Sequence, residues 1–312
     1  MTRVSASTLN FLVWIDDDGR REWVLERAAR FTEKHPSLML VLDNTGAHAG
    51  REPVASASRQ GELHDTMQSE RIDVDVTELD AQAVVAFCTE RYSPSVQTVL
   101  WWTGSNPRSS EAFEALLGIA GLLIVDSSGA TGDDSALSRL IGFHRDRPQV
   151  VLRDLAWLRL GPWRDMIAHF FDNPELLNEL FQIRKVAIVS GSTSEALYLA
   201  GWLASRLEWT PTGPGQLRDR DGKEISFSHR REGEMRRVHS ICLDSETSWY
   251  HGEVTSDPDV VSIWVEGAHA RDARLFPLHL LDTASLIERA ILDEGADELF
   301  EIALKAVGTL LG

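Results

Sequence analysis

Leu9-Asn-Phe-Leu-Val-Trp-Ile15 is an apolar run of strand length, and Asp16-Asp-Asp-Gly19 closes it with an acidic turn. From Arg20 to Lys34 the large apolar side chains recur at the spacing of a helix. A short apolar strand followed by a turn and a helix is the first half of a βαβ unit. This stretch therefore predicts a parallel sheet with helices packed on it.

The same alternation continues as far as residue 149. Short apolar runs predict further strands at residues 38–42, 72–76, 96–102 and 122–125. Segments with helical spacing predict helices at residues 80–91, 109–117 and 135–143. Residues 43–61, rich in Gly, Ala, Ser and His, are predicted to form a long loop. We therefore expect a mostly parallel N-terminal α/β domain over residues 1–149.

The pattern changes after the turn-rich segment Pro211-Thr-Gly-Pro-Gly215. Short strands without helices between them are predicted at residues 225–227, 238–243, 249–254 and 260–265. This arrangement indicates antiparallel pairing. Two helices are predicted at residues 283–293 and 296–311. We expect residues 150–312 to form an α+β domain with a small antiparallel sheet, within a chain of the α/β class.

The composition argues against two classes of partner. The 312 residues include 48 acidic and 31 basic side chains, and the formal net charge is −17. Such a charge opposes binding to nucleic-acid phosphates and to anionic membranes. No apolar run approaches the ~20 residues that span a bilayer, and the first residues lack the apolar core of a signal peptide. The sequence therefore predicts a cytoplasmic protein with no nucleic-acid partner and no membrane association.

Cysteine and histidine usage indicates neither a metal site nor a disulfide framework. Cys88 and Cys242 are the only cysteines, they are far apart, and both are expected to be buried thiols. The ten histidines are scattered without a pair at ligand spacing. Gly213-Pro-Gly215 neither follows a strand nor opens a clear helix, so it is a turn and not a dinucleotide motif. We expect no metal and no cofactor.

The acidic turn after the first strand has two interpretations. Asp16 and Asp18 resemble the nucleophile loop of haloacid-dehalogenase phosphatases, in which two carboxylates at a strand end hold Mg²⁺ and attack phosphate. That loop continues with Thr, whereas Arg20 stands here. The alternative is an acidic turn in which Asp18 or a neighbour caps the following helix.

A second strand, turn and helix are predicted around residue 190. Val186-Ala-Ile-Val-Ser190 is a short apolar run, and a helix is expected from Ala196 to Trp209. The turn consists of Ser190, Gly191, Ser192, Thr193 and Ser194. It has the layout of a phosphosugar-binding loop, in which hydroxyls and backbone amides at a helix N-terminus hold an anion. Ser192 with Glu195 is equally the Ser-x-x-Glu pattern of a capping box.

The segment between residues 153 and 172 concentrates aromatic and cationic side chains. Trp157 and Trp163 lie beside Arg159 and Arg164. Trp and Arg are residue types that anchor protein interfaces. The same side chains can instead be internal, with the indole rings filling the seam between the two halves and the guanidinium groups paired with nearby aspartates.

Two patterns carry a resemblance to a known family. The first is Asp154-Leu-Ala-Trp-x-Arg-Leu-x-Pro-Trp-Arg164, and the second is Leu199-Ala-Gly-Trp-Leu-Ala-Ser-Arg-Leu-x-Trp209. Both resemble segments of the glucose-6-phosphate dehydrogenase assembly proteins, the OpcA type. The resemblance extends more weakly over the rest of the chain.

The resemblance implies a non-enzymatic protein of the oxidative pentose phosphate pathway. It implies an allosteric activator that binds glucose-6-phosphate dehydrogenase and favours its active oligomer, without catalytic residues or a cofactor. Trp157, Arg159, Trp163 and Arg164 are then candidates for the partner contact or for the scaffold behind it. The alternative hypothesis is a phosphosugar-binding sensor or a Mg-dependent phosphosugar hydrolase of α/β fold that uses the loop Ser190–Ser194.

Overall fold

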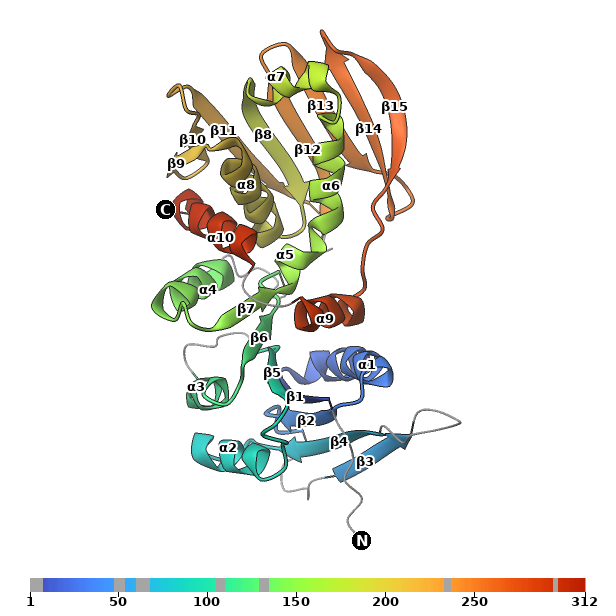
Figure 1. Cartoon of the computed structure of the whole chain (residues 1–312), viewed down its shortest axis with the longest axis vertical. Coiled ribbons are helices and arrows are strands. Elements are labelled where there is room, and N and C mark those ends of the chain that lie inside the picture. The colour runs from blue at the N-terminus through green and yellow to red at the C-terminus, as the bar shows by residue number, and fades with distance from the viewer. Residues whose placement is uncertain are drawn as a thin grey trace. The chain divides into compact units, whose positions relative to one another are not determined.

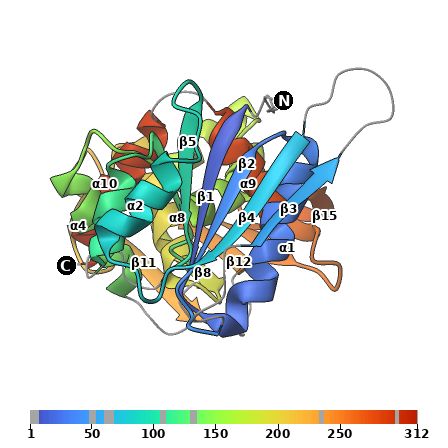
Figure 2. The same cartoon turned by 90° about the horizontal axis from the view of Figure 1, so that it is seen from below.

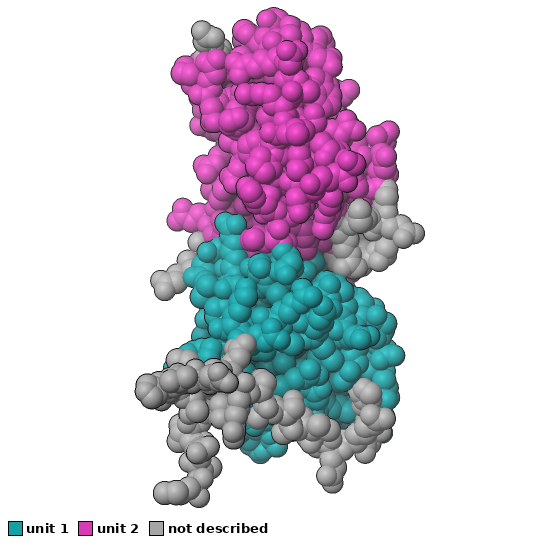
Figure 3. All heavy atoms as spheres, turned by 90° about the vertical axis from the view of Figure 1, so that its right-hand side faces the viewer, with its two compact units in different colours: residues 1–126, 142–155, 282–296 teal, residues 127–141, 156–281, 297–312 magenta. Residues whose placement is uncertain are grey.

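The computed structural model describes residues 8–47, 54–59, 68–104, 110–128, 135–232, 237–293 and 297–311. The chain forms two compact units, which are coloured separately in Figure 3. The first comprises residues 1–126, 142–155 and 282–296, and the second comprises residues 127–141, 156–281 and 297–312. The predicted domain boundary after residue 149 stays a prediction, and the two units each collect several separate segments of the chain.

The described strands of the first unit form a seven-stranded sheet in the order β3-β4-β2-β1-β5-β6-β7 (Figures 1 and 2). The strands are β1 (Leu9–Ile15), β2 (Leu38–Asp43), β3 (Val54–Arg59), β4 (Gln68–Asp75), β5 (Gln97–Trp102), β6 (Leu122–Val125) and β7 (Val151–Asp154). Every neighbouring pair is parallel except β3 with β4. Without the edge strand β3, this is the order of a doubly wound sheet, whose topological switch point lies between β1 and β5.

Helices cover both faces of this sheet (Figure 1). They are α1 (Asp18–Lys34), α2 (Ala81–Thr89), α3 (Glu111–Leu117), the last residues of α4 (Ser135–Asp146) and α9 (Thr283–Leu292). Phe31 of α1 packs on Phe11 at 5.2 Å between ring centroids, and Phe113 of α3 packs on Trp102 at 4.9 Å. Strand β1 is buried along its whole length because it has helices on both sides.

Side-chain caps fix where several helices begin. A side-chain oxygen at the N-cap accepts a hydrogen bond from a backbone N–H of the first turn, which would otherwise lack a partner. The caps of α1, α2, α3, α8 and α9 are, in that order, Asp17, Asp80, Ser110, Ser192 and Asp282.

The described strands of the second unit form an eight-stranded sheet in the order β15-β14-β13-β12-β8-β11-β10-β9. The strands are β8 (Ile183–Ser190), β9 (Thr210–Gly213), β10 (Gln216–Arg218), β11 (Glu224–Arg231), β12 (Val238–Ser245), β13 (Ser248–Val254), β14 (Val260–Gly267) and β15 (Arg271–Pro277). All neighbours are antiparallel except β8 with β11.

Helices pack on one face of this second sheet. Besides the first part of α4, the helical segments of this unit are α5 (Leu155–Arg159), α6 (Gly161–Phe170), η2 (Pro174–Leu176), α7 (Leu177–Leu180), α8 (Thr193–Leu207) and α10 (Glu298–Leu311). Phe170 contacts Tyr250 of β13 at 5.6 Å between ring centroids. Burial alternates along β12, β13 and β14, which is the pattern of a sheet with one face in the core.

The predicted fold class is confirmed, and the structure corrects its details. Residues 54–59, expected to lie in a loop, form β3 and pair with β4, whereas residues 48–53 and 60–61 of that expected loop lie outside the described residues. Strands β7, β9, β10 and β15 were not expected from the sequence. The second sheet is larger than predicted and contains one parallel pair.

Candidate functional site

The Trp157 side chain lies in the core of the second unit. It is 2% exposed, and its ring contacts Tyr198 and Phe300 at centroid distances of 5.8 and 5.7 Å. Its Nε1 donates a hydrogen bond of 2.8 Å to Oδ2 of Asp297. The Asp297 Oδ1 accepts from the backbone N–H of Phe300 at 2.9 Å, so Trp157 orients the residue that caps α10.

Arg164 and Trp163 are also part of the internal structure of this unit. The Arg164 guanidinium stacks over the Trp157 ring, with Cζ 3.9 Å from the ring centroid. Its Nη1 donates to the Trp157 carbonyl oxygen at 3.2 Å. Trp163 is 3% exposed. A stacked guanidinium stabilises the ring by a cation–π contact, so Arg164 supports Trp157 from α6.

Arg159 joins α5 to the first turn of α8. Its Nη1 lies 2.7 Å from Oε1 of Glu195 and donates to Oγ of Ser128 at 2.9 Å. The two charged side chains are 16% and 1% exposed, respectively. A carboxylate this deeply buried requires a cation beside it. Arg159 therefore connects the aromatic segment with the helix that follows the loop Ser190–Ser194.

The loop Ser190–Ser194 uses its serine hydroxyls within the protein. Ser190 is fully buried, and its Oγ donates to the carbonyl oxygen of Ser192 at 2.7 Å and lies 3.0 Å from Nε2 of His229. Ser194 Oγ donates to the carbonyl oxygen of Ser127 at 3.1 Å.

The remaining positions of this loop form the start of α8. Ser192 Oγ accepts from the backbone N–H of Glu195 at 3.4 Å, so the predicted cap is confirmed. Thr193 is the first helical residue, and the Gly191 N–H donates to the carbonyl oxygen of Arg237 at 3.0 Å. The Glu195 carboxylate, which completes the Ser-x-x-Glu pattern in the sequence, accepts from Arg159.

The carboxyl ends of β1 and β5 meet at the switch point of the first sheet. Trp14 and Trp102 stack there at 4.7 Å with an interplanar angle of 11°, and each is 4% exposed. A Cβ on Gly104 would lie 2.6 Å from Oδ2 of Asp16 and 2.8 Å from Nε1 of Trp102. The space beside Gly104 is therefore already filled by side chains of this unit.

The acidic turn after β1 caps a helix. Asp17 is the N-cap of α1, and its Oδ1 accepts from the Gly19 backbone N–H at 3.0 Å. The structure confirms the capping interpretation and assigns the cap to Asp17, the neighbour of Asp18.

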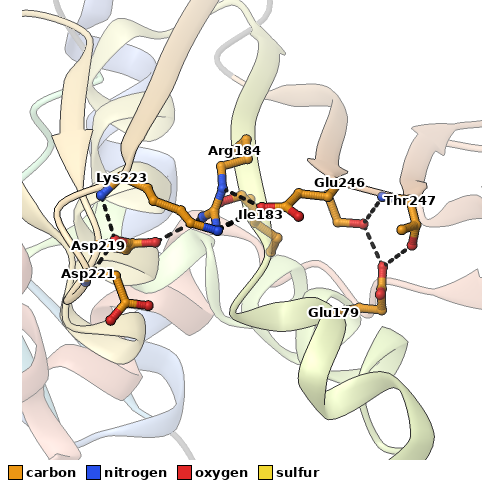
Figure 4. Close-up of polar contacts among 9 residues, drawn as sticks. Glu179, Ile183, Arg184, Asp219, Asp221, Lys223, Glu246 and Thr247 are labelled. Carbon is orange, nitrogen blue, oxygen red and sulfur yellow. Dashed lines mark hydrogen bonds and ion pairs between the residues drawn. The ribbon is translucent and has the colours of Figure 1, made fainter.

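A polar network at one end of the second sheet was missed by the sequence interpretation (Figure 4). Arg184 lies between Asp219 at 3.1 Å and Glu246 at 3.2 Å, and Lys223 lies 3.1 Å from the same oxygen of Glu246. Hydrogen bonds from Lys223 and then Arg184 hold the pKa of Glu246 below its ordinary value. Arg184 lies 35 residues before Asp219 and 62 residues before Glu246, so no local pattern indicates that they meet.

Glu179 of α7 anchors the turn between β12 and β13 (Figure 4). The Glu179 side chain is 7% exposed, and its Oε2 accepts from the hydroxyls of Ser245 at 2.6 Å and Thr247 at 2.8 Å. Burial, with the nearby Glu179 carboxylate, raises the pKa of Tyr250 to about 12. The two hydrogen bonds accepted by Glu179 therefore hold the turn that joins β12 to β13.

Within the described ranges, no group of three or more His, Cys, Asp or Glu side chains is arranged to hold a metal ion. Among the helices that the structure describes, none combines the length and the apolar character needed to cross a bilayer.

Solved oxidoreductases have a similar fold. A 3-ketoreductase from Actinomadura kijaniata in complex with NADP and TDP-benzene has a TM-score of 0.54 at 14% identity, with 97% of this chain and 96% of that chain covered. Biliverdin reductase from Synechocystis, in complex with biliverdin and NADP⁺, has a TM-score of 0.50 at 10% identity and the same coverage. At these identities the likeness defines the class of fold alone.

Sequence comparison defines the family. The family model described as glucose-6-phosphate dehydrogenase subunit N-terminal domain matches residues 28–141, and the corresponding C-terminal domain model matches residues 150–304. The chain belongs to the OpcA-type glucose-6-phosphate dehydrogenase assembly family.

Curated relatives match part of the chain. Proteins described as OxPP cycle protein OpcA are 35% identical over 125 residues in Synechocystis sp. and 37% identical over 114 residues in Nostoc punctiforme. These alignments cover 39% and 36% of this chain. The chain spans only about a quarter of the length of these relatives, at 26% and 24%.

Proposed function

We propose that this chain is a non-enzymatic, cytoplasmic assembly factor of the oxidative pentose phosphate pathway. It binds glucose-6-phosphate dehydrogenase and acts as an allosteric activator by favouring the active oligomer. The family descriptions support this role, because the models that match the two parts of the chain both refer to a subunit of that dehydrogenase.

The activator requires a difference in affinity and no chemistry of its own. A protein that binds the active oligomer more tightly than the inactive form shifts the equilibrium between them by the ratio of the two affinities. Each ~1.4 kcal/mol of preference shifts that equilibrium tenfold. Such a factor needs a stable surface and neither a base nor a nucleophile.

The observation that carries the non-enzymatic assignment is the turn between β1 and α1. In dinucleotide-binding sheets this turn is glycine-rich and presents free N–H groups of the helix N-terminus to the pyrophosphate. Here Asp16, Asp17 and Asp18 are consecutive carboxylates, and Asp17 already accepts the N–H of Gly19. Like charges repel a pyrophosphate, and Asp16 with Trp102 fills the space beside Gly104. The residues present do not fit NADP.

The geometry gives the phosphosugar hypothesis no support. An anion at the start of α8 would need the hydroxyls and amides of the loop Ser190–Ser194, but Ser190, Ser192 and Ser194 direct their hydroxyls to protein groups. The hypothesis stays a prediction. Calorimetric titration with glucose 6-phosphate tests it directly.

In this proposal the scaffold behind the surface that binds the partner is formed by Trp157, Arg159, Trp163 and Arg164. The two indoles are buried, and Arg159 and Arg164 contact Glu195 and Trp157. A scaffold and a contact differ in one measurable respect. Substitution in a scaffold lowers partner affinity and the unfolding free energy together, whereas substitution in an exposed contact lowers affinity alone.

The direct test uses purified glucose-6-phosphate dehydrogenase from the same cells. Addition of this chain should raise dehydrogenase activity and increase the mass of the enzyme measured by light scattering. The same preparation without the dehydrogenase should neither reduce NADP⁺ with glucose 6-phosphate nor release phosphate from it. Unchanged dehydrogenase activity and mass at saturating chain would rule out the assembly function.

A further inference from the structure

The eight-stranded sheet has a second face opposite the one on which α6 and α8 pack. Along β12 and β13 the buried residues Ile241, Leu243 and Tyr250 alternate with Cys242 and His251, which are half-buried. Alternation of this kind puts the second set on the opposite face. We call this the open face.

The strand register sets out the open face in three rows. The first row is Ser226, Lys185, Asp244, Trp249 and Glu266, on β11, β8, β12, β13 and β14. The second row is Ser228, Ala187, Cys242, His251 and Trp264. The third row is Arg230, Val189, Ser240, Glu253, Ser262 and, on β15, Leu275.

The open face combines a flat centre with exposed apolar side chains. Ala187, Cys242 and Ser240 are small and occupy its middle strands. Trp249 is 41% exposed and Leu275 is 72% exposed. A flat, partly apolar sheet face is suited to packing against another sheet at a separation of about 10 Å.

The charges on the open face are separated by sign. The cations Lys185 and Arg230 lie on β8 and β11, and the anions Asp244, Glu253 and Glu266 lie on β12, β13 and β14. All of these charges belong to the first and third rows, which flank the second row. A surface with cations on one half and anions on the other half is complementary to itself after a two-fold rotation.

We propose that the open face binds the open face of a second copy of this chain. A two-fold axis that runs along the strands between β8 and β12 superposes each row on the same row of the second copy. It places Lys185 opposite Asp244 of the second copy and Arg230 opposite Glu253 of the second copy. Each contact occurs twice because the interface is isologous. The small residues Ala187 and Cys242 face each other across the axis.

The charge pattern favours a second copy of this chain over other partners. A nucleic acid or an anionic lipid surface binds to a positively charged face. The open face carries charges of both signs, and the chain has a net charge of −17. Within one chain Arg230 pairs with Glu232 at 2.8 Å, an exposed pair that can exchange partners at small cost.

The test is the mass of the full chain in solution. Sedimentation equilibrium at micromolar concentration in low salt should give twice the 34.8 kDa of one chain. The variant Lys185→Glu should raise the dissociation constant of the dimer at least about tenfold, because it sets two like charges opposite each other in each symmetric contact. The exchange Lys185→Asp with Asp244→Lys should restore the dimer.

A matched control separates the interface from general effects of charge. Lys305 is an exposed cation on α10, and Lys305→Glu should leave the mass unchanged. Circular dichroism should show that all variants fold. A wild-type chain that is monomeric at 100 times its assay concentration would overturn the proposal. A wild-type monomer whose binding to the dehydrogenase is lost in Lys185→Glu would assign the face to that enzyme instead.

Discussion

At the scale of single residues, the ion pair between Arg159 and Glu195 gives a sharp prediction about stability. The Arg159→Met substitution removes the cation that lies 2.7 Å from a carboxylate only 1% exposed. Breaking a buried pair in this way costs about 3–5 kcal/mol. Replacement of both residues by Met should cost less than the single change, because no buried charge then remains. Urea unfolding of the two variants and of Glu195→Met measures the coupling.

One result of these unfolding measurements would contradict the prediction. If the double replacement is as destabilising as the sum of the two single ones, Arg159 and Glu195 are not coupled and the pair does not join α5 to α8.

The two thiols should react slowly in the folded protein. Burial raises the pKa of Cys88 to about 12, and burial with the nearby Asp244 raises that of Cys242 to about 11. At pH 8 the thiolate fraction of Cys242 is then roughly one in a thousand, against roughly a quarter for a free cysteine. Reaction with a thiol reagent should be about 200-fold slower than in urea and should accelerate with pH. Rapid labelling of Cys242 at pH 7 would contradict this.

At the scale of elements, Glu179 should determine the stability of the turn between β12 and β13. The Glu179→Ala substitution leaves the buried Ser245 hydroxyl and the neighbouring Thr247 hydroxyl without their shared acceptor. Loss of an acceptor at a buried site costs about 1–3 kcal/mol. Hydrogen exchange should become faster in β12 and β13 first. The exposed residue Glu224 provides the control, since Glu224→Ala should leave exchange in that turn unchanged.

The elements that the sequence predicted well are those whose local pattern agrees with their burial. Strand β1 is a continuous apolar run with helices on both sides, and α1 has an acidic N-cap in the sequence. Strand β3 is different, because its sequence Val-Ala-Ser-Ala-Ser-Arg is largely small and polar and it forms a strand by pairing with β4. Strand β15 likewise depends on pairing with β14.

The sequence predicts which residues are candidates for the site, but it does not predict which of them are in contact. Trp157 and Arg164 are identifiable from the sequence as unusual, but their contact joins two separate helices, α5 and α6. Asp297, the acceptor of the Trp157 N–H, lies 140 residues further along the chain. No sequence spacing encodes such a pair, so the sequence alone does not decide whether an indole is exposed or buried.

At the scale of the whole molecule, acid should destabilise both units. Burial opposes the ionisation of Asp43, yet hydrogen bonds from Arg21 and Thr45 hold its pKa below the ordinary value. A hydrogen bond from His35 lowers the pKa of Glu288, and Lys223 and Arg184 lower that of Glu246. A carboxyl with a lowered folded-state pKa stabilises the fold above the unfolded-state value of about 4.

The sign of the pH dependence follows from these shifts. The free energy of unfolding should not change with pH above about pH 5. It should fall as the pH drops through 4 toward the folded-state pKa values, because the unfolded chain then binds more protons than the folded chain. The Asp43→Asn variant should be less stable than the wild type at pH 7 and should lose less stability on acidification. Urea unfolding between pH 3 and pH 7 measures both quantities. An unchanged pH profile in this variant would show that Asp43 contributes nothing to it.

The two proposals combine into one expectation about activation. A two-fold dimer carries two identical partner-binding surfaces, and an oligomeric dehydrogenase offers repeated sites for them. Binding of the second surface is then intramolecular, which increases the apparent affinity by roughly 10²–10⁴ without any new contact. A bivalent factor of this kind favours the assembled enzyme, because dissociated subunits cannot hold both surfaces at once.

The monomeric variant tests this expectation. In Lys185→Glu the concentration of chain that gives half-maximal activation should rise by about 100-fold, while the activity at saturation should still exceed that of the dehydrogenase alone. Lys305→Glu should match the wild type. If the monomeric variant activates at the same concentration as the wild type, each chain works singly, and the preference for the active oligomer resides in one partner-binding surface.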